Sequence, residues 1–156
     1  MQLITPQIAL GSRMDAADPV LLEQFSIDAV LSMEPVRLIQ PVSCQMILQV
    51  KDRVPLPDMT IQHAVEFMHQ QVTAGKRVLI HCQMGISRSP ALLMAYLHQH
   101  QNLSLLEALQ QIQRLRPQAE PHPVLIQSLQ AYYREPPQLQ ESLDLIGASS
   151  EGLCYG

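Results

Sequence analysis

A cysteine and an arginine lie six residues apart near the middle of the chain, in the segment His81-Cys82-Gln-Met-Gly85-Ile-Ser87-Arg88-Ser89-Pro90. A cysteine thiolate is a strong nucleophile, and the planar guanidinium of an arginine binds two phosphate oxygens at once, which lysine cannot do. A nucleophile and an anion-binding group in one short segment predict attack by Cys82 on a phosphate ester held by Arg88.

The expected local structure of this segment strengthens that prediction. An apolar run of strand length precedes Cys82, and a helical pattern follows Arg88, so the residues between them form a tight loop at a helix N-terminus. Such a terminus offers free N–H donors and about half a positive charge, and inward-pointing amides form a nest for an anion. Gly85 lets the backbone turn without a side chain in the way. In these surroundings the pKa of a cysteine falls from about 8.5 into the range of roughly 3.5–7.5.

Apolar runs at residues 7–10, 27–33, 44–50 and 77–82 predict the strands that position the loop. The last three are continuous rather than alternating, which indicates burial on both faces, as in a parallel sheet. We therefore expect an α/β fold in a single domain. Its twisted, mostly parallel central sheet has about four or five strands, helices flank both faces, and the loop lies at the carboxyl ends of the parallel strands.

The predicted helices are marked by start and stop signals. Asp18-Pro19 opens a short helix, and helical spacing over residues 60–74 is followed by Gly75 as a C-terminal cap. Ser104 and Glu107 form a capping-box pattern for a helix that Pro117 stops. Further helices are expected at residues 88–100 and 123–134.

Composition and charge exclude several classes of function. The formal net charge is −4 without any run of Lys or Arg, which argues against partners such as nucleic acid or an anionic membrane. No stretch of about 18 apolar residues is present. The three cysteines form no CxxC pair, so a reducing cytoplasm is the simplest setting. We expect a monomer, with a domain over residues 1–136 and a polar C-terminal tail over residues 137–156.

The segment around Cys82 resembles the signature His-Cys-x5-Arg-Ser/Thr of cysteine-dependent protein tyrosine phosphatases, and most closely the dual-specificity phosphatase family. The similarity extends to IALGS near the N-terminus, to the VLSM run and to AYL in the helix after the signature, and it covers about residues 3–134. It implies metal-independent hydrolysis of phosphotyrosine and phosphoserine/threonine in proteins through a phosphocysteine intermediate, without a cofactor.

The resemblance also implies a role for each residue of the segment. Cys82 would be the nucleophile, Arg88 would clamp the transition state, and Ser89 would hydrogen-bond the sulfur and ease its departure. His81 would order the loop. The phosphate would be bound by the backbone amides of Gln83, Met84, Gly85, Ile86, Ser87 and Arg88.

The general acid has two candidates. The family places an aspartate about thirty residues before the cysteine, and Asp52 lies thirty residues before Cys82, just past an expected strand. Asp58 lies twenty-four residues before Cys82, where it can serve as an N-terminal helix carboxylate ahead of Thr60. We therefore favour Asp52 over Asp58.

Substrate and redox chemistry leave alternatives open. Relatives that act on phosphoinositides tend to carry lysine in this loop, and its absence here favours phosphoproteins, with phosphoinositide, sugar or nucleotide phosphates as the alternative. A non-catalytic phosphate-binding module has no need of Cys82, Asp52 and Arg88 together. Arg37 and Arg53 could flank the mouth, although surface charge is the simpler interpretation. Cys44 is expected to be a small buried hydrophobe, with a disulfide to oxidised Cys82 as a minor alternative.

Overall fold

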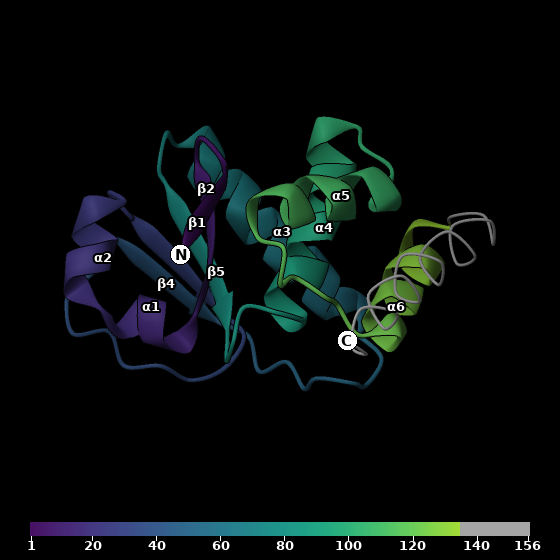
Figure 1. Cartoon of the computed structure of the whole chain (residues 1–156), viewed down its shortest axis with the longest axis horizontal. Coiled ribbons are helices and arrows are strands. Elements are labelled where there is room, and N and C mark those ends of the chain that lie inside the picture. The colour runs from purple at the N-terminus through teal and green to yellow at the C-terminus, as the bar shows by residue number, and fades with distance from the viewer. Residues whose placement is uncertain (135–156) are drawn as a thin grey trace, which may run out of the picture.

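The computed structural model describes residues 1–134, which form one five-stranded sheet with helices on both faces (Figure 1). The strand order is β1-β2-β5-β3-β4, and only β1 runs antiparallel to its neighbour. This confirms the expected α/β architecture with a mostly parallel sheet. The strands are β1 (Gln2–Thr5), β2 (Ile8–Ser12), β3 (Ala29–Ser32), β4 (Cys44–Ile47) and β5 (Val78–Cys82).

The helices divide into a thin layer and a thick layer. In Figure 1, α1 and α2 lie on one side of the sheet, and the other helices lie on the opposite side. The two thin-layer helices are α1 (Arg13–Ala17) and α2 (Pro19–Gln24). The thick layer contains α3 (Asp58–Thr73), α4 (Arg88–Gln101), α5 (Leu105–Leu115) and α6 (Pro123–Tyr133).

The central strand β5 is buried along its whole length, between β2 and β3. Its side chains alternate between the two layers: Leu79 packs with Val30 and Leu22 under α1 and α2, whereas Val78 and Ile80 join the larger core. Burial on both faces explains the continuous apolar run of this strand. The residue that ends it, Cys82, is thereby held in the buried centre of the sheet.

The expected capping residues occupy their predicted positions. The Asp18 side chain accepts hydrogen bonds from the first amides of α2, and Ser104 and Glu107 form a reciprocal capping box at α5. Gly75, just past α3, has φ of +76°, a conformation in which glycine carries no steric penalty. These local signals place the helices that support the sheet.

Two elements and one burial pattern differ from the sequence-based expectation. β1 and α1 were not expected, although Ser12 and Asp15 form a capping box that begins α1. The prediction that residues 44–50 are buried on both faces is wrong, because β4 is an edge strand. Its side chains alternate: Cys44 is only partly buried, and Gln45 is exposed.

The fold also excludes a disulfide between Cys44 and Cys82. Ala29 of β3 pairs with both Cys44 and Val78, and Cys82 lies four residues beyond Val78. At about 3.3 Å per residue and about 4.8 Å per strand, the two Cα atoms are roughly 13 Å apart along the strands and about 10 Å apart across them. A disulfide needs Cα atoms within about 7 Å. The suggestion that Cys44 caps an oxidised Cys82 is therefore wrong.

Within residues 1–134, no helix is long and apolar enough to cross a membrane. The same residues contain no group of three or more His, Cys, Asp or Glu side chains that could hold a metal ion. The expected C-terminal tail at residues 137–156 lies outside the described part of the chain.

Candidate active site

The loop between β5 and α4 is the centre of the candidate site. Cys82 is the last residue of β5, and Arg88 is the first residue of α4. Ser87, the N-cap residue of α4, makes no side-chain hydrogen bond to the helix. The first amides of this 14-residue helix are therefore left to bind an anion, as the sequence predicts for the loop.

Cys82 is only 2% exposed, and its sulfur accepts a 3.2 Å hydrogen bond from the Ser89 hydroxyl. Burial raises the pKa of the Cys82 thiol. The Ser89 hydroxyl, the amides of Ser89 and Gly85 and the positive charge of Arg88 together outweigh burial, so the pKa lies below its ordinary value. The structure thus brings together three of the predicted groups, Cys82, Ser89 and Arg88, around an ionisable sulfur.

Gly85 sits where the phosphate loop touches the neighbouring strand end. Its φ is +67°, and a Cβ at this position would lie 2.5 Å from the carbonyl oxygen of Gly11. Only glycine fits both the backbone conformation and the close approach. The Gln83 carbonyl also accepts a hydrogen bond from the Arg13 amide (3.1 Å), so the loop is fixed against the segment that follows β2.

Arg116 supports the loop from below, and the sequence analysis did not identify it. It is only 5% exposed, and it donates from Nε to the Gly85 carbonyl (2.8 Å) and from Nη2 to the Met84 carbonyl (3.0 Å). Its Nη1 also contacts Gln2 of β1. By engaging the loop carbonyls, Arg116 turns the loop amides toward the opposite, anion-binding side.

The guanidinium of Arg88 is held from one side. Its Nη1 donates to the Val50 carbonyl (2.9 Å), and its Nη2 donates to Oε2 of Glu34 (3.3 Å). Both contacts use positions just past the carboxyl ends of β3 and β4. An arginine has five N–H donors, so three remain for a phosphate. Glu34 was also missed by the sequence analysis, although an acidic residue directly after a buried strand was a usable signal.

Asp52 lies against the phosphate loop. Its Oδ1 accepts a 2.8 Å hydrogen bond from the Ser87 hydroxyl, and the Ser87 oxygen in turn accepts one from the His122 amide (3.0 Å). Leu56, further along the same loop, is buried and donates its amide to Ser128. Asp52 is therefore on an exposed loop that is anchored close to the predicted phosphate site.

Asp58 occupies the first turn of α3, where a carboxylate interacts favourably with the helix dipole. No hydrogen bond or ion pair within residues 1–134 links its side chain to the phosphate loop. This placement agrees with the helix-terminus interpretation of Asp58.

His81 is completely buried beneath the loop. Its Nε2 lies 2.7 Å from the Ser32 hydroxyl, and its Nδ1 lies 3.2 Å from the Cys82 carbonyl. Burial lowers the pKa of His81, outweighing the opposite effects of the Cys82 carbonyl and of Glu34, so the ring is neutral at physiological pH. This contact between β3 and the end of β5 fits the loop-ordering role expected for His81. Ser32 carried no sequence signal.

Comparison with known proteins agrees with this geometry. A family model described as "Dual specificity phosphatase, catalytic domain" matches residues 8–135. Tyrosine-protein phosphatase vhp-1 of Caenorhabditis elegans is 30% identical over 132 residues, which is 77% of this chain and 19% of that protein. Dual specificity protein phosphatase 15 of Mus musculus is 31% identical over 135 residues, 85% of this chain and 57% of the other.

The fold is also similar to that of a solved structure, human DUSP28. The TM-score is 0.80 at 28% identity, and the match covers 91% of this chain and 99% of that one. The chain spans about a fifth to just over half of the length of the first curated relatives that it matches. Because the family model covers most of the chain, together with the loop that carries Cys82 and Arg88, the chain belongs to the dual specificity phosphatase catalytic domain family.

Proposed function

We propose that this chain is a cysteine-dependent, metal-independent phosphatase that hydrolyses phosphotyrosine and phosphoserine or phosphothreonine in proteins. The observation that carries this proposal is the 3.2 Å hydrogen bond from Ser89 to the buried sulfur of Cys82 at the floor of a loop with uncapped amides. A thiolate held at that position faces any phosphate that the loop binds.

In the first step, the Cys82 thiolate attacks phosphorus, and the bond from phosphorus to the leaving oxygen breaks. Asp52, protonated at this stage, gives its proton to the leaving oxygen. The amides of residues 83–88 and the three remaining N–H donors of Arg88 stabilise the charge on the equatorial oxygens. The anchoring of Arg88 by Glu34 and Val50 means that little reorganisation is needed.

In the second step, water attacks the phosphocysteine, and Asp52 accepts a proton from that water. The bond between phosphorus and sulfur breaks, inorganic phosphate is released, and the thiolate of Cys82 is restored. The hydroxyl of Ser89 stabilises the departing sulfur, because it already donates to that atom. Both hydrogen bonds that Asp52 accepts within residues 1–134 go to Oδ1, so Oδ2 is available to carry the proton.

The thiol chemistry indicates the cellular compartment of the enzyme. The nucleophile works only while it is reduced, and a cytosolic environment keeps thiols reduced. We therefore propose a cytoplasmic enzyme, and we further propose that it acts as a monomer without a cofactor. The neutral loop side chains Gln83, Met84 and Ile86 favour a phosphorylated amino acid over a polyphosphorylated lipid headgroup.

The test is phosphate release from a panel of phosphopeptides by the purified full chain in the presence of a metal chelator. The wild type should turn over, Cys82→Ser should bind substrate without turnover, and Arg88→Lys should lose both binding and rate. Cys44→Ser is the matched control and should turn over normally, because Cys44 lies at the opposite end of the sheet. Turnover that survives Cys82→Ser, or a wild type that releases no phosphate from any peptide, would refute the proposal.

A further inference from the structure

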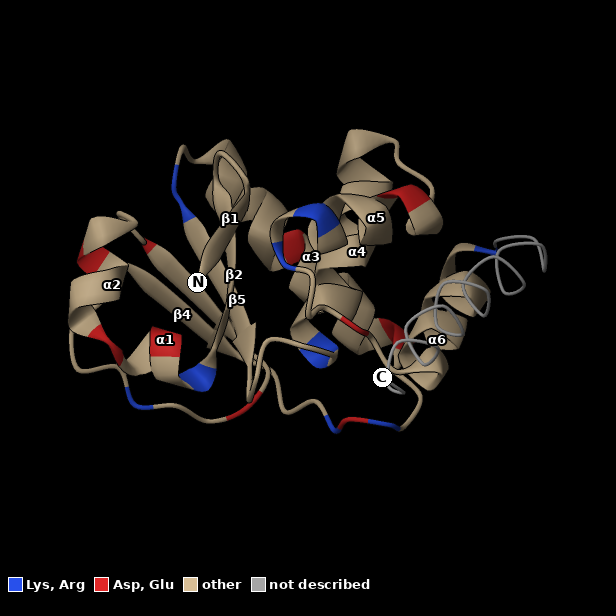
Figure 2. Ribbon diagram, viewed as in Figure 1, with Lys and Arg blue, Asp and Glu red and all other residues tan. Residues whose placement is uncertain are grey.

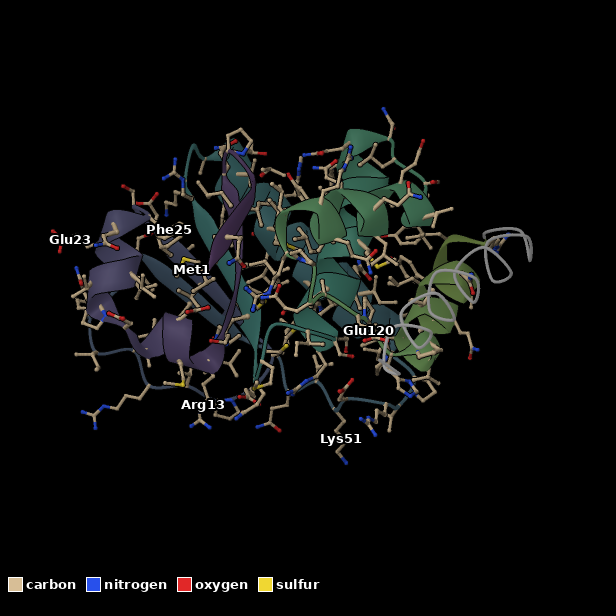
Figure 3. The ribbon with its side chains drawn as sticks, viewed as in Figure 1. Met1, Arg13, Glu23, Phe25, Lys51 and Glu120 are labelled. Atoms are coloured by element: carbon tan, nitrogen blue, oxygen red, sulfur yellow. The ribbon has the colours of Figure 1, made fainter. Side chains whose placement is uncertain are left out.

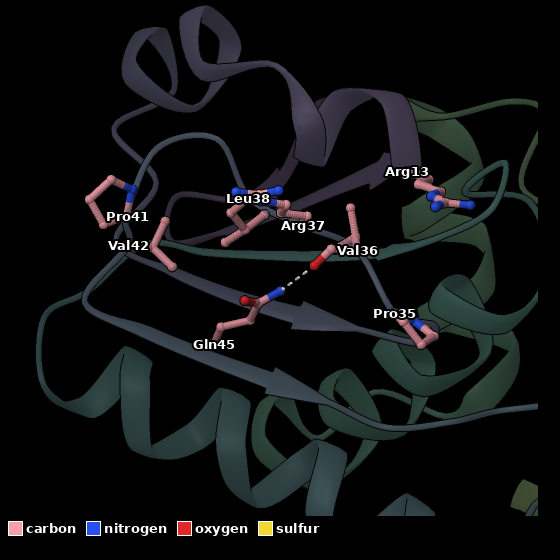
Figure 4. Close-up of a pocket in the computed structure, with 8 residues that line it drawn as sticks. All are labelled: Arg13, Pro35, Val36, Arg37, Leu38, Pro41, Val42 and Gln45. Atoms are coloured by element: carbon pink, nitrogen blue, oxygen red, sulfur yellow. Dashed lines mark hydrogen bonds between the residues drawn. The ribbon is translucent and has the colours of Figure 1, made fainter.

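A groove of about 740 Å³ lies on the side of the sheet that carries α1 and α2. The segment between β3 and β4 forms most of its lining, and Figure 4 shows these side chains. Leu38 and Val42 also pack against the thin core layer beneath α1 and α2. None of the steps proposed for phosphate hydrolysis uses this groove.

One end of the groove adjoins the phosphate loop. Arg13 and Pro35 line this end (Figure 4); Arg13 directly follows β2, and Pro35 lies three residues past the carboxyl end of β3. The amide of Arg13 donates to the carbonyl of Gln83 in the phosphate loop (3.1 Å). Pro35 directly follows Glu34, which pairs with Arg88. A peptide whose phosphorylated residue occupies the loop can therefore continue into the groove.

The floor of the groove contacts the residues beneath Cys82. Gln45 of β4 donates to the carbonyl of Val36, a bond drawn in Figure 4, and to the hydroxyl of Ser32 (both 3.4 Å). Ser32 in turn contacts His81, which precedes Cys82. A chain of hydrogen bonds thus connects Gln45 in the groove, through Ser32 and His81, to the backbone carbonyl of Cys82.

The charge of the groove is opposite to that of the chain. Two arginines, Arg13 and Arg37, line it without any carboxylate, whereas the formal net charge of the whole chain is −4. Both side chains belong to exposed residues, and no ion pair among residues 1–134 uses either of them. Figure 3 shows Arg13 at the edge of the molecule, and Figure 2 shows basic and acidic segments interspersed along the same edge.

We propose that this groove binds the part of a phosphoprotein substrate that adjoins the phosphorylated residue, with Arg13 and Arg37 pairing with an anionic side chain of that segment. The apolar walls, including Val36 and Leu38, accommodate the aliphatic parts of the same segment. The anionic group is a carboxylate or a second phosphate, which share the charge and the geometry that arginine prefers. The proposal rests on the proposed function, because it assumes a phosphorylated residue in the loop.

The test is binding of matched phosphotyrosine peptides to the Cys82→Ser variant, measured by fluorescence anisotropy. The peptides differ only beside the phosphotyrosine, where they carry aspartates, a phosphoserine, lysines or alanines. The aspartate peptide should bind about fivefold more tightly than the alanine peptide at low salt, and the phosphoserine peptide should exceed it. This preference should fall as salt is added, since the arginines are exposed.

Variants then assign the preference to the groove. Adding Arg13→Ala or Arg37→Ala should each reduce the ratio between aspartate and alanine peptides, and Arg13→Glu with Arg37→Glu should reverse the preference toward lysine peptides. Arg114→Ala, an exposed arginine of α5 outside the groove, is the matched control and should leave the ratio unchanged.

Equal binding of all peptides, or a preference that persists in the doubly reversed variant, would overturn the groove assignment. So would groove variants that lose binding to phosphatidylcholine vesicles carrying a phosphoinositide while peptide preference is unaffected, because the occupant would then be a lipid. The binding measurement does not depend on turnover, because it uses the Cys82→Ser variant. A wild type that releases no phosphate but keeps the charge preference would refute the proposed catalysis and retain the groove.

Discussion

The hydroxyl of Ser87 donates a 2.8 Å hydrogen bond to Oδ1 of Asp52. The Ser87 hydroxyl oxygen in turn accepts a hydrogen bond from the His122 amide (3.0 Å). One hydroxyl in the phosphate loop therefore joins the loop that carries Asp52 to the segment that leads into α6. The position of the proposed general acid depends on a residue of the phosphate loop itself.

Ser87→Ala should misplace Asp52 while leaving the nucleophile intact. We expect kcat for a phosphoserine peptide to fall about tenfold, since positioned general acids contribute about 10²–10⁴-fold and the carboxylate is only displaced. Turnover of p-nitrophenyl phosphate should fall less, because its leaving group needs no proton. Ser87→Thr keeps the hydroxyl and should restore most of the peptide rate. Equal losses on both substrates would contradict a link through Asp52.

Asp52→Asn and Asp58→Asn form a matched pair that assigns the general acid. We expect Asp52→Asn to lower kcat for a phosphoserine peptide by about 10²–10⁴-fold, with a smaller loss on p-nitrophenyl phosphate. Asp58→Asn should change stability only slightly, through the dipole of α3, and should leave kcat intact. Should Asp58→Asn show the selective loss instead, the two assignments would have to be exchanged.

Ser89→Ala should raise the pKa of the Cys82 thiol. Burial alone raises this pKa, and the Ser89 hydroxyl is foremost among the groups that bring it below its ordinary value. Without that donor the thiolate is less stable, so the titration should move to higher pH. The measurement is the rate of inactivation by iodoacetamide against pH, in a Cys44→Ser background. An unchanged midpoint would show that the amides and Arg88 lower the pKa without help from Ser89.

Gly85→Ala should destabilise the fold and the site together. The new Cβ would lie 2.5 Å from the Gly11 carbonyl oxygen and 2.6 Å from Nη2 of Arg116, at a φ of +67°. We expect a loss of about 2–4 kcal/mol in the free energy of unfolding, from overpacking and backbone strain combined. Gly75→Ala is the control, because its φ is +76° but nothing lies within 4 Å of the added Cβ.

The control variant Gly75→Ala should lose about 1 kcal/mol in the free energy of unfolding, which corresponds to the backbone penalty alone. Urea denaturation of the two variants separates the two contributions. If both glycines gave the same loss, the contact between Gly85 and Gly11 would carry no energetic weight.

Arg116→Met should leave the carbonyls of Met84 and Gly85 without their donor. A buried acceptor that loses its partner costs about 1–3 kcal/mol, so we expect a destabilisation of about 2–4 kcal/mol and a slower phosphatase. Arg114→Met, an exposed residue two positions earlier on α5, should stay within about 0.5 kcal/mol of the wild type. Thermal unfolding of the two variants measures the difference.

The sequence predicted the parts of the site that are continuous in the chain. Cys82, Gly85, Arg88 and Ser89 belong to one strand–loop–helix segment, so local conformational rules place them beside each other. The same holds for the capping box at Ser104, which needs only neighbouring residues. The fold class followed because parallel strands buried on both faces leave a continuous apolar pattern.

The supporting contacts are long-range, and this explains why they were missed. Glu34 and Arg88 are 54 residues apart, and Arg116 and Gly85 are 31 residues apart. No local pattern signals that an arginine ahead of a proline will fold beneath a distant loop. The misassigned burial of β4 has a similar cause: its apolar run is like that of a central strand, and only the strand order shows that it lies at an edge.

Because β4 lies at the sheet edge, the segment that enters it tolerates substitution differently from the strand that carries the nucleophile. The nucleophile ends a strand enclosed by neighbours on both sides, so substitutions there disturb the interior of the domain. The segment that enters β4 lies at the margin, where exposed residues such as Arg37 and Ile39 can be exchanged at little cost to folding. Substrate preference can therefore change through substitutions in this segment, while the residues that carry out hydrolysis stay the same.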